Sequence, residues 1–435
     1  MNAREFARRR KQLMELIGAN GIAVLTAAPE RVRSRDTLFT YRPDSDFYYL
    51  TGFEEPDAVA VLVPGRSQGE FLLFCRERNP ERELWDGPRA GPEGAVADHA
   101  ADDAFPITDL DDILPGLLER SDRVYYSMGV APEFDQRLLA FLQTLNSKRQ
   151  SGHAPSELVA LDHLLHEMRL FKSRAESSVM RRSARIAVAA HARAMLACRP
   201  GMREYELEAE FLHEFRRHGA DCSYPPIVAA GANACVLHYR ANNAELVDGD
   251  LVLIDAGCEY QMYASDVTRV FPVSGKFSEP QRELYEVVLT ANQAATAKAA
   301  VGNHWNDPHD AAVAEVTRGL KDLGLLSGRL PSLVRAGAYR EFFMHRTGHW
   351  LGIDVHDVGD YKVADQWRLL EPGMVMTIEP GIYVAPDTKG PAKRWRGIGI
   401  RIEDDVQVTR AGPDVLTAGL PTTVKDIEKH MATRA

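Results

Sequence analysis

The chain has 435 residues, of which 45% are hydrophobic and 26% are charged, and its formal net charge is −10. This length exceeds what one ordinary hydrophobic core fills, so two globular domains are expected. The acidic balance and the lack of a clustered basic face argue against nucleic acid as a partner, because phosphate binding requires concentrated Lys and Arg. No segment approaches the roughly 18–20 consecutive apolar residues of a membrane span, so no membrane partner is expected either.

The N-terminus and the cysteines both bear on the compartment. The first 17 residues predict an amphipathic helix with Phe6, Leu13 and Ile17 facing inward. Its arginines at residues 8–10 are expected on a solvated face and not in an export signal, because no apolar stretch follows them. Five scattered cysteines without Cys-x-x-Cys spacing indicate thiols in a reducing compartment. We therefore expect a cytoplasmic protein.

Residues 1–170 are expected to form the first domain. Strands are predicted at residues 21–29, twice within residues 46–65 with a turn between, and at residues 70–78 and 123–129; helices are predicted at residues 114–119 and 133–145, and an acidic loop at residues 88–112. This alternation predicts a compact α/β domain with a mixed sheet. It contains no phosphate-cradling glycine loop and no nucleophile elbow, so by itself it discloses no function.

Residues 171–435 are expected to form a second, α+β domain. A long helix begins near the boundary and ends at Pro200-Gly201, and further helices are predicted at residues 204–218, 279–301 and 308–323. Short apolar segments lie before and between these helices. They predict a curved antiparallel sheet covered by helices, with a site built from several strands.

Two aspartates interrupt an apolar stretch at residues 251–271. Asp255 ends a run of four aliphatic residues, and Asp266 follows eleven residues later. If the chain reverses at Tyr260-Gln261, the two aspartates are directly opposed in an antiparallel pair, with Cβ atoms about 5 Å apart. Two carboxylates at that distance either share a proton or hold a cation between them.

Three later segments add candidate ligands. His345, His349 and His356 lie among glycines in FFMHRTGHWLGIDVHDVG. Period-two alternation places Glu379 on one face of an apolar strand in MVMTIEPGIY. In GIGIRIEDD the same alternation separates Arg401 and Glu403 from three isoleucines.

The charge of this set favours metal over a shared proton. Four carboxylates, Asp255, Asp266, Glu379 and Glu403, sum to −4, which two divalent cations cancel. Carboxylate-rich coordination with one imidazole suits hard ions such as Mn²⁺. Two such ions about 3.5–4 Å apart can generate a nucleophilic hydroxide and clamp a hydrolytic transition state.

The same five residues carry a family resemblance. Asp255, Asp266, His349, Glu379 and Glu403 stand in the frames LIDAG, SDVTR, GHWLG, TIEPG and RIED. In this order they resemble the dinuclear metal site of the pita-bread metallopeptidases. SDFYYLTGF near the N-terminus and HEMRLFKS at mid-chain make the chain most similar to the bacterial Xaa-Pro aminopeptidases, also called aminopeptidases P.

The resemblance implies a manganese-dependent hydrolase that removes an N-terminal residue when proline is second. Asp255 would chelate one metal, His349 and Glu379 the other, and Asp266 and Glu403 would bridge them. A metal-bridging hydroxide would attack the carbonyl before proline, with Glu379 moving a proton.

Other residues receive roles from the same resemblance. His356 would stabilise the oxyanion, His238 and His345 would orient the substrate, and Arg401 would tune the site. Trp85, Asp36 and Arg149 match residues that the family brings near the substrate, the aromatic one from a neighbouring subunit. A homotetramer built as a dimer of dimers would follow.

Two alternatives and one departure accompany this interpretation. A prolidase that cuts Xaa-Pro dipeptides would share the metals, and a metal-free pita-bread module would only bind peptides or proteins.

Related sequences usually have a small residue after the first histidine of the His345 segment, where this chain has Arg346. We predict that Arg346 points outward and pairs with an acidic group, because a guanidinium beside the cluster would oppose metal.

Overall fold

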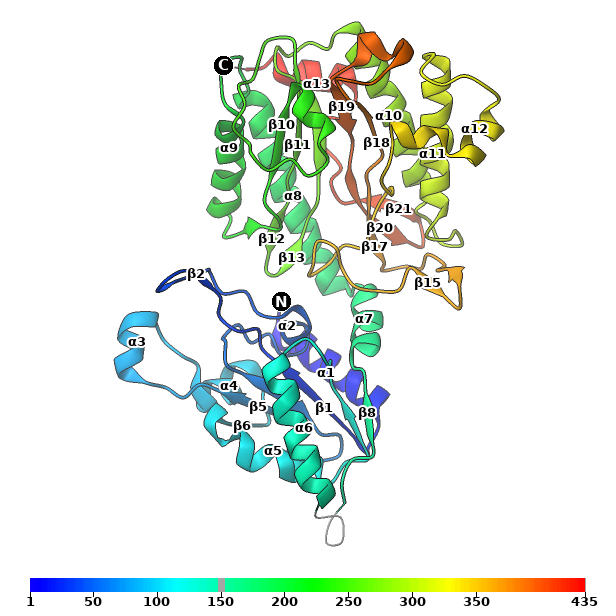
Figure 1. Ribbon diagram of the computed structural model, residues 1–435. Helices are drawn as coiled ribbons and strands as arrows, with labels where there is room; N and C mark the ends of the chain where they lie inside the picture. Colours follow the sequence, from blue (N-terminus) through cyan, green and yellow to red (C-terminus); the bar gives the residue numbers. More distant parts are fainter. Residues whose placement is uncertain (148–152, 435) are drawn as a thin grey trace. The chain divides into compact units, whose positions relative to one another are not determined.

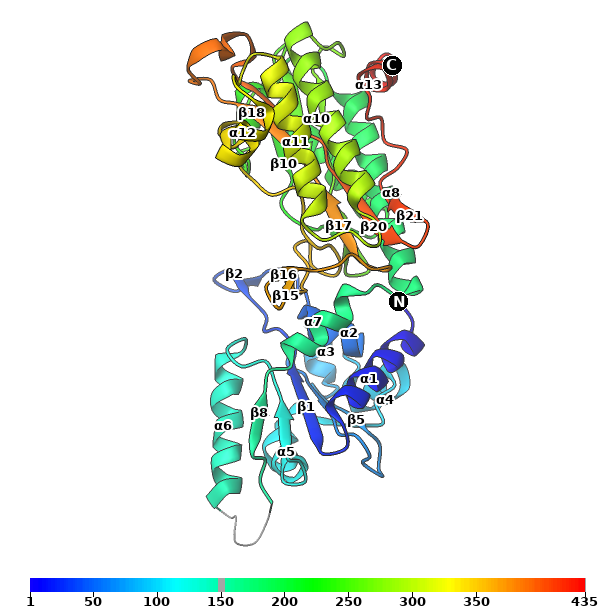
Figure 2. The ribbon, with the colours of Figure 1, turned by 90° about the vertical axis from the view of Figure 1, so that its right-hand side faces the viewer.

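The computed structural model describes residues 1–147 and 153–434, which form two compact units. Unit 1 comprises residues 1–169 and unit 2 comprises residues 170–435. Figures 1 and 2 show the elements of each unit in two perpendicular views.

Unit 1 is built on a mixed six-stranded sheet with the order β6-β5-β4-β1-β7-β8. Its strands are β1 (Gly21–Thr26), β4 (Val59–Leu62), β5 (Phe71–Cys75), β6 (Asp103–Pro106), β7 (Arg123–Tyr125) and β8 (Glu157–Val159). The pairs β1/β4 and β4/β5 are antiparallel, whereas β5/β6, β1/β7 and β7/β8 are parallel. The predicted mixed sheet is confirmed.

Helices and one hairpin complete unit 1. The helices are α1 (Ala3–Ile17), α2 (Ser45–Thr51), α3 (Pro80–Asp86), α4 (Gly91–His99), α5 (Leu110–Leu118), α6 (Pro132–Ser147) and α7 (Asp162–Leu170), the last ending at the unit boundary; β2 (Val32–Ser34) and β3 (Thr37–Leu38) form the hairpin. Helices α5 and α6 pack their leucines on the sheet to form one core.

The aromatic segment at residues 45–51 is a helix, where we predicted a strand. The Asp44 side chain accepts a hydrogen bond from the Phe47 amide at the N-terminus, and Gly52 ends the helix at φ 62°. All residues of α2 except Asp46 are buried, so no alternation of buried and exposed residues distinguishes helix from strand here.

The buried arginines of α1 follow from that same helix. Arg9 and Arg10 are 0% and 4% exposed, so the prediction of a solvated face is wrong for both. Their guanidiniums donate to the carbonyls of Tyr49 and Leu50 at 2.9 Å. These carbonyls belong to the last turn of α2, where a helix has no amide donors left for its own carbonyls, so the two arginines cap its C-terminus.

The acidic segment at residues 88–112 is not a loop as predicted. It contains α4, β6 and the first residues of α5. Only Gly91 and Ala95 of α4 are buried, so the apolar periodicity that marks a helix is weak there.

Unit 2 contains antiparallel sheets, as predicted. Their orders are β10-β11-β14, β13-β12-β9, β17-β20-β21 and β18-β19, with a separate β15-β16 hairpin. The strands are β9 (Asp221–Cys222), β10 (Ile227–Ala230), β11 (Leu251–Asp255), β12 (Cys258–Tyr260), β13 (Tyr263–Ala264), β14 (Thr268–Pro272), β15 (Lys362–Val363), β16 (Gln366–Trp367), β17 (Val375–Ile378), β18 (Gly381–Val384), β19 (Ile398–Arg401), β20 (Asp404–Thr409) and β21 (Gly412–Val415).

Helices lie across one side of these sheets. They are α8 (Arg174–Ala197), α9 (Glu204–Arg217), α10 (Glu279–Lys298), α11 (Asp307–Asp322), α12 (Leu330–Ala336) and α13 (Val424–Met431). Figure 2 shows α8, α10 and α11 side by side in front of the strands. No helix among the described residues is long and apolar enough to cross a bilayer.

The hairpin that carries the two aspartates turns one residue later than predicted. The turn residues are Gln261 and Met262, both with positive φ (50° and 68°). Asp255 therefore pairs with Thr268 and not with Asp266. Moving the turn by one residue shifts the register by two, and because side chains alternate with period two, both carboxylates still share one face.

Candidate metal centre

The candidate ligands lie where strands of unit 2 end. Asp255 is the last residue of β11, Glu379 directly follows β17, and Glu403 lies between β19 and β20. The His349 segment runs beside β17, where the Thr377 amide donates to the His349 carbonyl at 2.9 Å. Gly348 permits this contact, because a Cβ there would lie 2.0 Å from the Thr377 carbonyl oxygen.

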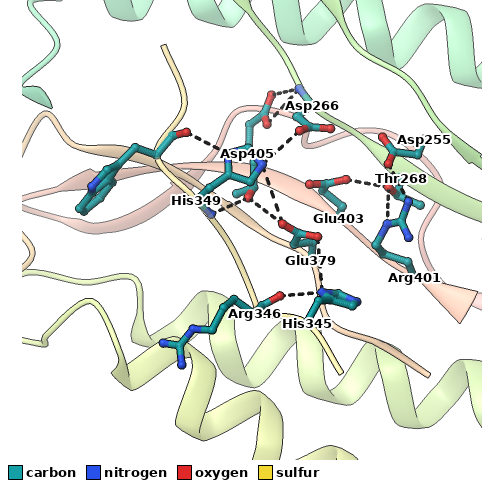
Figure 3. A network of polar contacts seen from close by, with 12 residues as sticks. Asp255, Asp266, Thr268, His345, Arg346, His349, Glu379, Arg401, Glu403 and Asp405 are labelled. Atoms are coloured by element: carbon teal, nitrogen blue, oxygen red, sulfur yellow. Dashed lines mark hydrogen bonds and ion pairs between the residues drawn. The ribbon is translucent and has the colours of Figure 1, made fainter. Parts of the chain in front are cut away.

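One cavity of about 270 Å³ gathers the predicted residues of unit 2. Its lining comprises Leu237, His238, Asp255, Asp266, His345, Arg346, Gly348, His349, His356, Glu379, Arg401 and Glu403. All five candidate metal ligands and all four further candidates for catalysis therefore face the same space. Figure 3 shows the carboxylates converging with His349 between them.

His349 presents one ring nitrogen to the carboxylates. Its Nδ1 lies 2.8 Å from the Trp350 carbonyl oxygen and donates to it, so Nε2 is the nitrogen that can bind a metal ion once it is deprotonated. Nε2 lies 3.3 Å from Asp266 and 3.8 Å from Glu379. Burial lowers the pKa of His349, but the hydrogen bond and charge of Asp266 outweigh it and raise the pKa to about 9.

Arg401 neutralises part of the acidic cluster. Its Nη2 lies 2.6 Å from Asp255, and its Nε donates to Thr268 Oγ1 at 3.1 Å. Thr268 in turn donates to Glu403 at 2.6 Å. This guanidinium supplies one positive charge against the four carboxylates, which is not enough to neutralise them.

A chain of hydrogen bonds joins Arg401 to His345. Arg401 Nη1 donates to the Tyr383 hydroxyl at 2.9 Å, and that hydroxyl lies 2.9 Å from His345 Nε2. His345 Nδ1 donates to the Arg346 carbonyl at 2.7 Å, which fixes Nε2 as the acceptor. Burial, with the charge of Arg401, lowers the pKa of His345 to about 4, so the ring is neutral.

The carboxylates repel one another in a buried setting. Burial raises the pKa of Glu379 to about 7, against the charges of His349 and Arg401. Burial, with the charges of Asp266 and Glu379, raises the pKa of Glu403 well above its usual value. Burial also raises the pKa of Asp255, although the charge of Arg401 acts in the opposite direction. Such a set is poorly neutralised by protein groups alone.

These residues fit divalent metal ions. Ligand atoms of Asp266, His349 and Glu403 all lie within 4.8 Å of one another. One imidazole Nε2 with several carboxylate oxygens is a donor set suited to a hard divalent cation. Bound cations would supply the positive charge that the buried carboxylates lack.

Four residues of the centre were not predicted. The Tyr224 hydroxyl lies 2.5 Å from both Asp255 and Asp266, and the Asp266 amide donates to the buried carboxylate of Asp405 at 3.2 Å. Thr268 and Tyr383 are the others. Period-two alternation from Asp266, Glu379 and Glu403 would have found Thr268, Tyr383 and Asp405. Tyr224, which precedes two prolines, has no such sequence pattern.

Two of the N-terminal candidates, Trp85 and Asp36, are exposed residues of unit 1. Trp85 in α3 is 85% exposed, and Asp36 is exposed in the turn between β2 and β3. Arg149 lies outside the described residues. Within unit 1, an exposed Trp85 contradicts the ordinary expectation that an isolated tryptophan is core.

Arg346 points away from the carboxylates of the centre, as predicted (Figure 3), and the charge of Asp310 acts on it, but no acidic group forms a direct ion pair with it among the described residues. The guanidinium donates to the Asn306 side chain and lies 5.2 Å from the centre of the Trp367 ring. We expect Arg346→Gly to change Mn²⁺ affinity by no more than about fivefold, the size of an exposed charge effect. Isothermal titration of the metal-free protein measures this, and a gain of orders of magnitude would contradict the outward orientation.

Comparisons with known proteins agree with this geometry. Residues 178–410 match the family model of metallopeptidase family M24, and residues 6–125 match that of the aminopeptidase P N-terminal domain. The Xaa-Pro aminopeptidase of Escherichia coli (strain K12) is 45% identical over 99% of this chain and 98% of its own length. That of Haemophilus influenzae is 43% identical over 98% of this chain and 97% of its own.

Solved structures cover the whole chain. The aminopeptidase PepP of Pseudomonas aeruginosa superimposes with a TM-score of 0.98 at 58% identity, covering 100% of this chain and 99% of that one. A substrate complex of an Escherichia coli aminopeptidase P variant gives 0.97 at 44% identity, with the same coverage. The chain therefore belongs to metallopeptidase family M24, with the pita-bread catalytic fold and the N-terminal domain of the aminopeptidases P.

Proposed function

We propose that this chain is an Xaa-Pro aminopeptidase, a metallopeptidase that removes the N-terminal residue from peptides with proline in second position. The observation that carries the proposal is the single cavity that unites four carboxylates with His238, His345, His349 and His356. Full-length similarity to two bacterial Xaa-Pro aminopeptidases supports the same activity.

The proposed cofactor is a pair of divalent ions, most simply Mn²⁺. Asp255 would hold one ion, His349 and Glu379 the other, and Asp266 and Glu403 would bridge them. When bound, the ions would activate water and polarise the carbonyl before proline. One solved structure of the Escherichia coli aminopeptidase P is zinc-substituted, so that relative can also hold zinc.

The protein groups would handle the substrate and the proton. Glu379 would take a proton from the attacking water and return it to the proline nitrogen, which has no hydrogen of its own. His356 would donate to the developing oxyanion. Neutral His345, fixed by Tyr383, and His238 would orient the peptide around the proline. Arg401 would hold Asp255 in position through its ion pair.

Substrate length separates this proposal from a prolidase. A prolidase must bind the free carboxylate of a dipeptide, whereas an aminopeptidase P needs an open exit for the continuing chain. We expect Ala-Pro-Ala and longer peptides to have a higher kcat/KM than Ala-Pro, because contacts beyond proline contribute in the transition state.

The assay is a series from Ala-Pro to Ala-Pro-Ala-Ala with Ala-Ala controls of matched length. The controls should be poorer by about 1–3 kcal/mol, the size of pocket-shape discrimination. A preference for Ala-Pro over every longer member would assign the chain to the prolidases. Binding without turnover, at full metal occupancy, would leave the peptide-binding module as the explanation.

We also propose a homo-oligomer, specifically a tetramer built as a dimer of dimers. Leu84 and Trp85 on α3 are both 85% exposed, which is unusual for large apolar side chains unless another surface covers them. Trp85 would then approach the substrate site of a neighbouring subunit, and Asp36 and Arg149 would lie near substrate. Five free cysteines accord with a cytoplasmic location.

Sedimentation tests the assembly. We expect the wild-type chain to sediment as a tetramer and Trp85→Ala to lower kcat/KM for long peptides. Leu16→Ala, at an exposed apolar residue on α1, serves as the control. A fully active monomer would refute the oligomer.

A further inference from the structure

Glu204 is a buried carboxylate that contacts no candidate metal ligand. It is the first residue of α9 and is 0% exposed. Among the described residues, no Lys, Arg or His forms an ion pair with it. A buried carboxylate without a cation is costly unless hydrogen bonds satisfy its oxygens, so its donors indicate what it does.

Four donors satisfy Glu204, and all come from residues 230–244. One oxygen accepts from the Ala230 amide at 2.7 Å and the Asn233 side chain at 3.1 Å. The other accepts from the Tyr239 hydroxyl at 2.9 Å and the Ala244 amide at 2.8 Å. We name residues 230–244 the substrate loop, because Leu237 and His238 within it line the metal cavity.

The four bonds bracket His238 in sequence. Ala230 and Ala244 are the two ends of the substrate loop, and Tyr239 directly follows the histidine. The His238 side chain has no hydrogen bond to any described residue and is exposed toward the cavity. Its position therefore depends on the backbone that carries it, not on a partner for its ring.

A second contact fixes the loop from its other side. A Cβ at Gly399 in β19 would lie 2.2 Å from the Ala234 carbonyl oxygen, so the loop lies directly on the strand that carries Arg401. Between this strand and the carboxylate, the loop has little freedom to move. Asn242 adds an anchor by accepting from the Val228 amide at 3.0 Å and donating to the Pro226 carbonyl at 2.9 Å.

We infer that Glu204 is a positioning residue that sets the location of His238 through the substrate loop. The inference rests on the proposed substrate role of His238. It assigns Glu204 no contact with metal or peptide. Glu204→Gln keeps the shape of the side chain but replaces one carboxylate oxygen by an NH₂ group. That group cannot accept hydrogen bonds, so two of the four bonds to the substrate loop are lost.

The experiment combines amide hydrogen exchange with steady-state kinetics of peptide hydrolysis. In metal-free Glu204→Gln, amide hydrogens of the substrate loop, Ala230 and Ala244 first, should exchange faster than in the wild type, with Mn²⁺ affinity unchanged. In the loaded enzyme kcat/KM should fall on the order of 10- to 100-fold, the cost of about 1 Å of misplacement. Glu210→Gln is the matched control, because Glu210 lies on the same helix and pairs with Arg193.

A double-mutant cycle with His238→Ala tests whether Glu204 affects activity through His238. If Glu204 acts through His238, the double variant should be no slower than His238→Ala alone. Equal losses of kcat/KM on adding Glu204→Gln to the wild type and to His238→Ala would overturn the inference, and so would an unchanged rate of amide hydrogen exchange in the substrate loop.

The proposed substrate role of His238 is tested separately. If His238→Ala is fully active, that role fails, whereas an unchanged exchange rate in Glu204→Gln rejects the claim that Glu204 fixes the loop. Should Glu204→Gln not fold, Tyr239→Phe removes one of the four bonds and is expected to show the same non-additivity.

Discussion

Chelation should abolish hydrolysis of Ala-Pro-Ala and lower the melting temperature, and Mn²⁺ should restore both. The physical reason is the buried set of Asp255, Asp266, Glu379 and Glu403, whose charges Arg401 and His349 only partly balance. A ligand that binds only the folded state at about 1,000 times its dissociation constant stabilises it by about 4 kcal/mol. Calorimetric scans of loaded and chelated protein measure this, and full activity in metal-stripped enzyme would refute the dinuclear centre.

The same experiment has a defined pH dependence. Without metal, the folded-state pKa values of Glu379 and His349 are raised to about 7 and about 9. Stability from their protonation is therefore present below the unfolded values and is lost as pH rises through about 7 and about 9. Metal binding requires both groups deprotonated. The melting-temperature gap between loaded and chelated protein should widen from about pH 6 to about pH 9.

Two histidine variants test whether the rise in melting temperature depends on metal bound at His349. His349→Ala should remove most of the metal-dependent rise in melting temperature, whereas His213→Ala, at an exposed position on α9, should leave it intact. A gap that stays constant with pH would contradict the protonation of Glu379 and His349 in the metal-free state.

Lys172→Met should destabilise unit 2 by about 3–5 kcal/mol. The Lys172 ammonium lies 2.8 Å from Asp357, and both side chains are 1% exposed. Removing the ammonium leaves the buried Asp357 carboxylate without that positive charge. The resulting loss of stability exceeds the net stability that the ion pair itself contributes. Gly352 shows how closely the pair is packed, because a Cβ there would lie 2.0 Å from the Asp357 carboxylate.

The measurement is urea unfolding followed by tryptophan fluorescence. Four of the five tryptophans belong to unit 2, so the transition reports mainly on that unit. Lys276→Met is the control, since that ammonium is 72% exposed in its pair with Glu428 and should cost under about 1 kcal/mol. Because Asp357 follows His356 in the chain, kcat should fall in Lys172→Met as well. A loss no larger than that of the control would show that the pair is not buried in solution.

Local periodicity determined which residues share a face. Alternation placed Glu379 on one face of its strand and Glu403 on the same face as Arg401, because successive side chains of a strand point to opposite faces whatever the strand packs against. The aspartate hairpin shows how tolerant this rule is: the turn was one residue late, the register moved by two, and the face stayed the same. The ordered frames around the five candidate ligands also identified the family from the sequence alone.

Only the tertiary structure decided how the polar groups are partnered. Arg9 and Arg10 are buried because the last turn of α2 presents to each of them a carbonyl that lies 40 residues away in the sequence, and no local pattern encodes that contact. Tyr224 reaches both aspartates, and Glu204 holds the substrate loop, for the same reason. The free energy of a buried polar side chain depends on donors and acceptors from distant segments, whereas alternation and turn chemistry depend on neighbours in the chain. The sequence by itself therefore determined which residues around the candidate ligands share a strand face, and it identified the family. The tertiary structure decided which charges are neutralised and which distant groups hold the site residues in place.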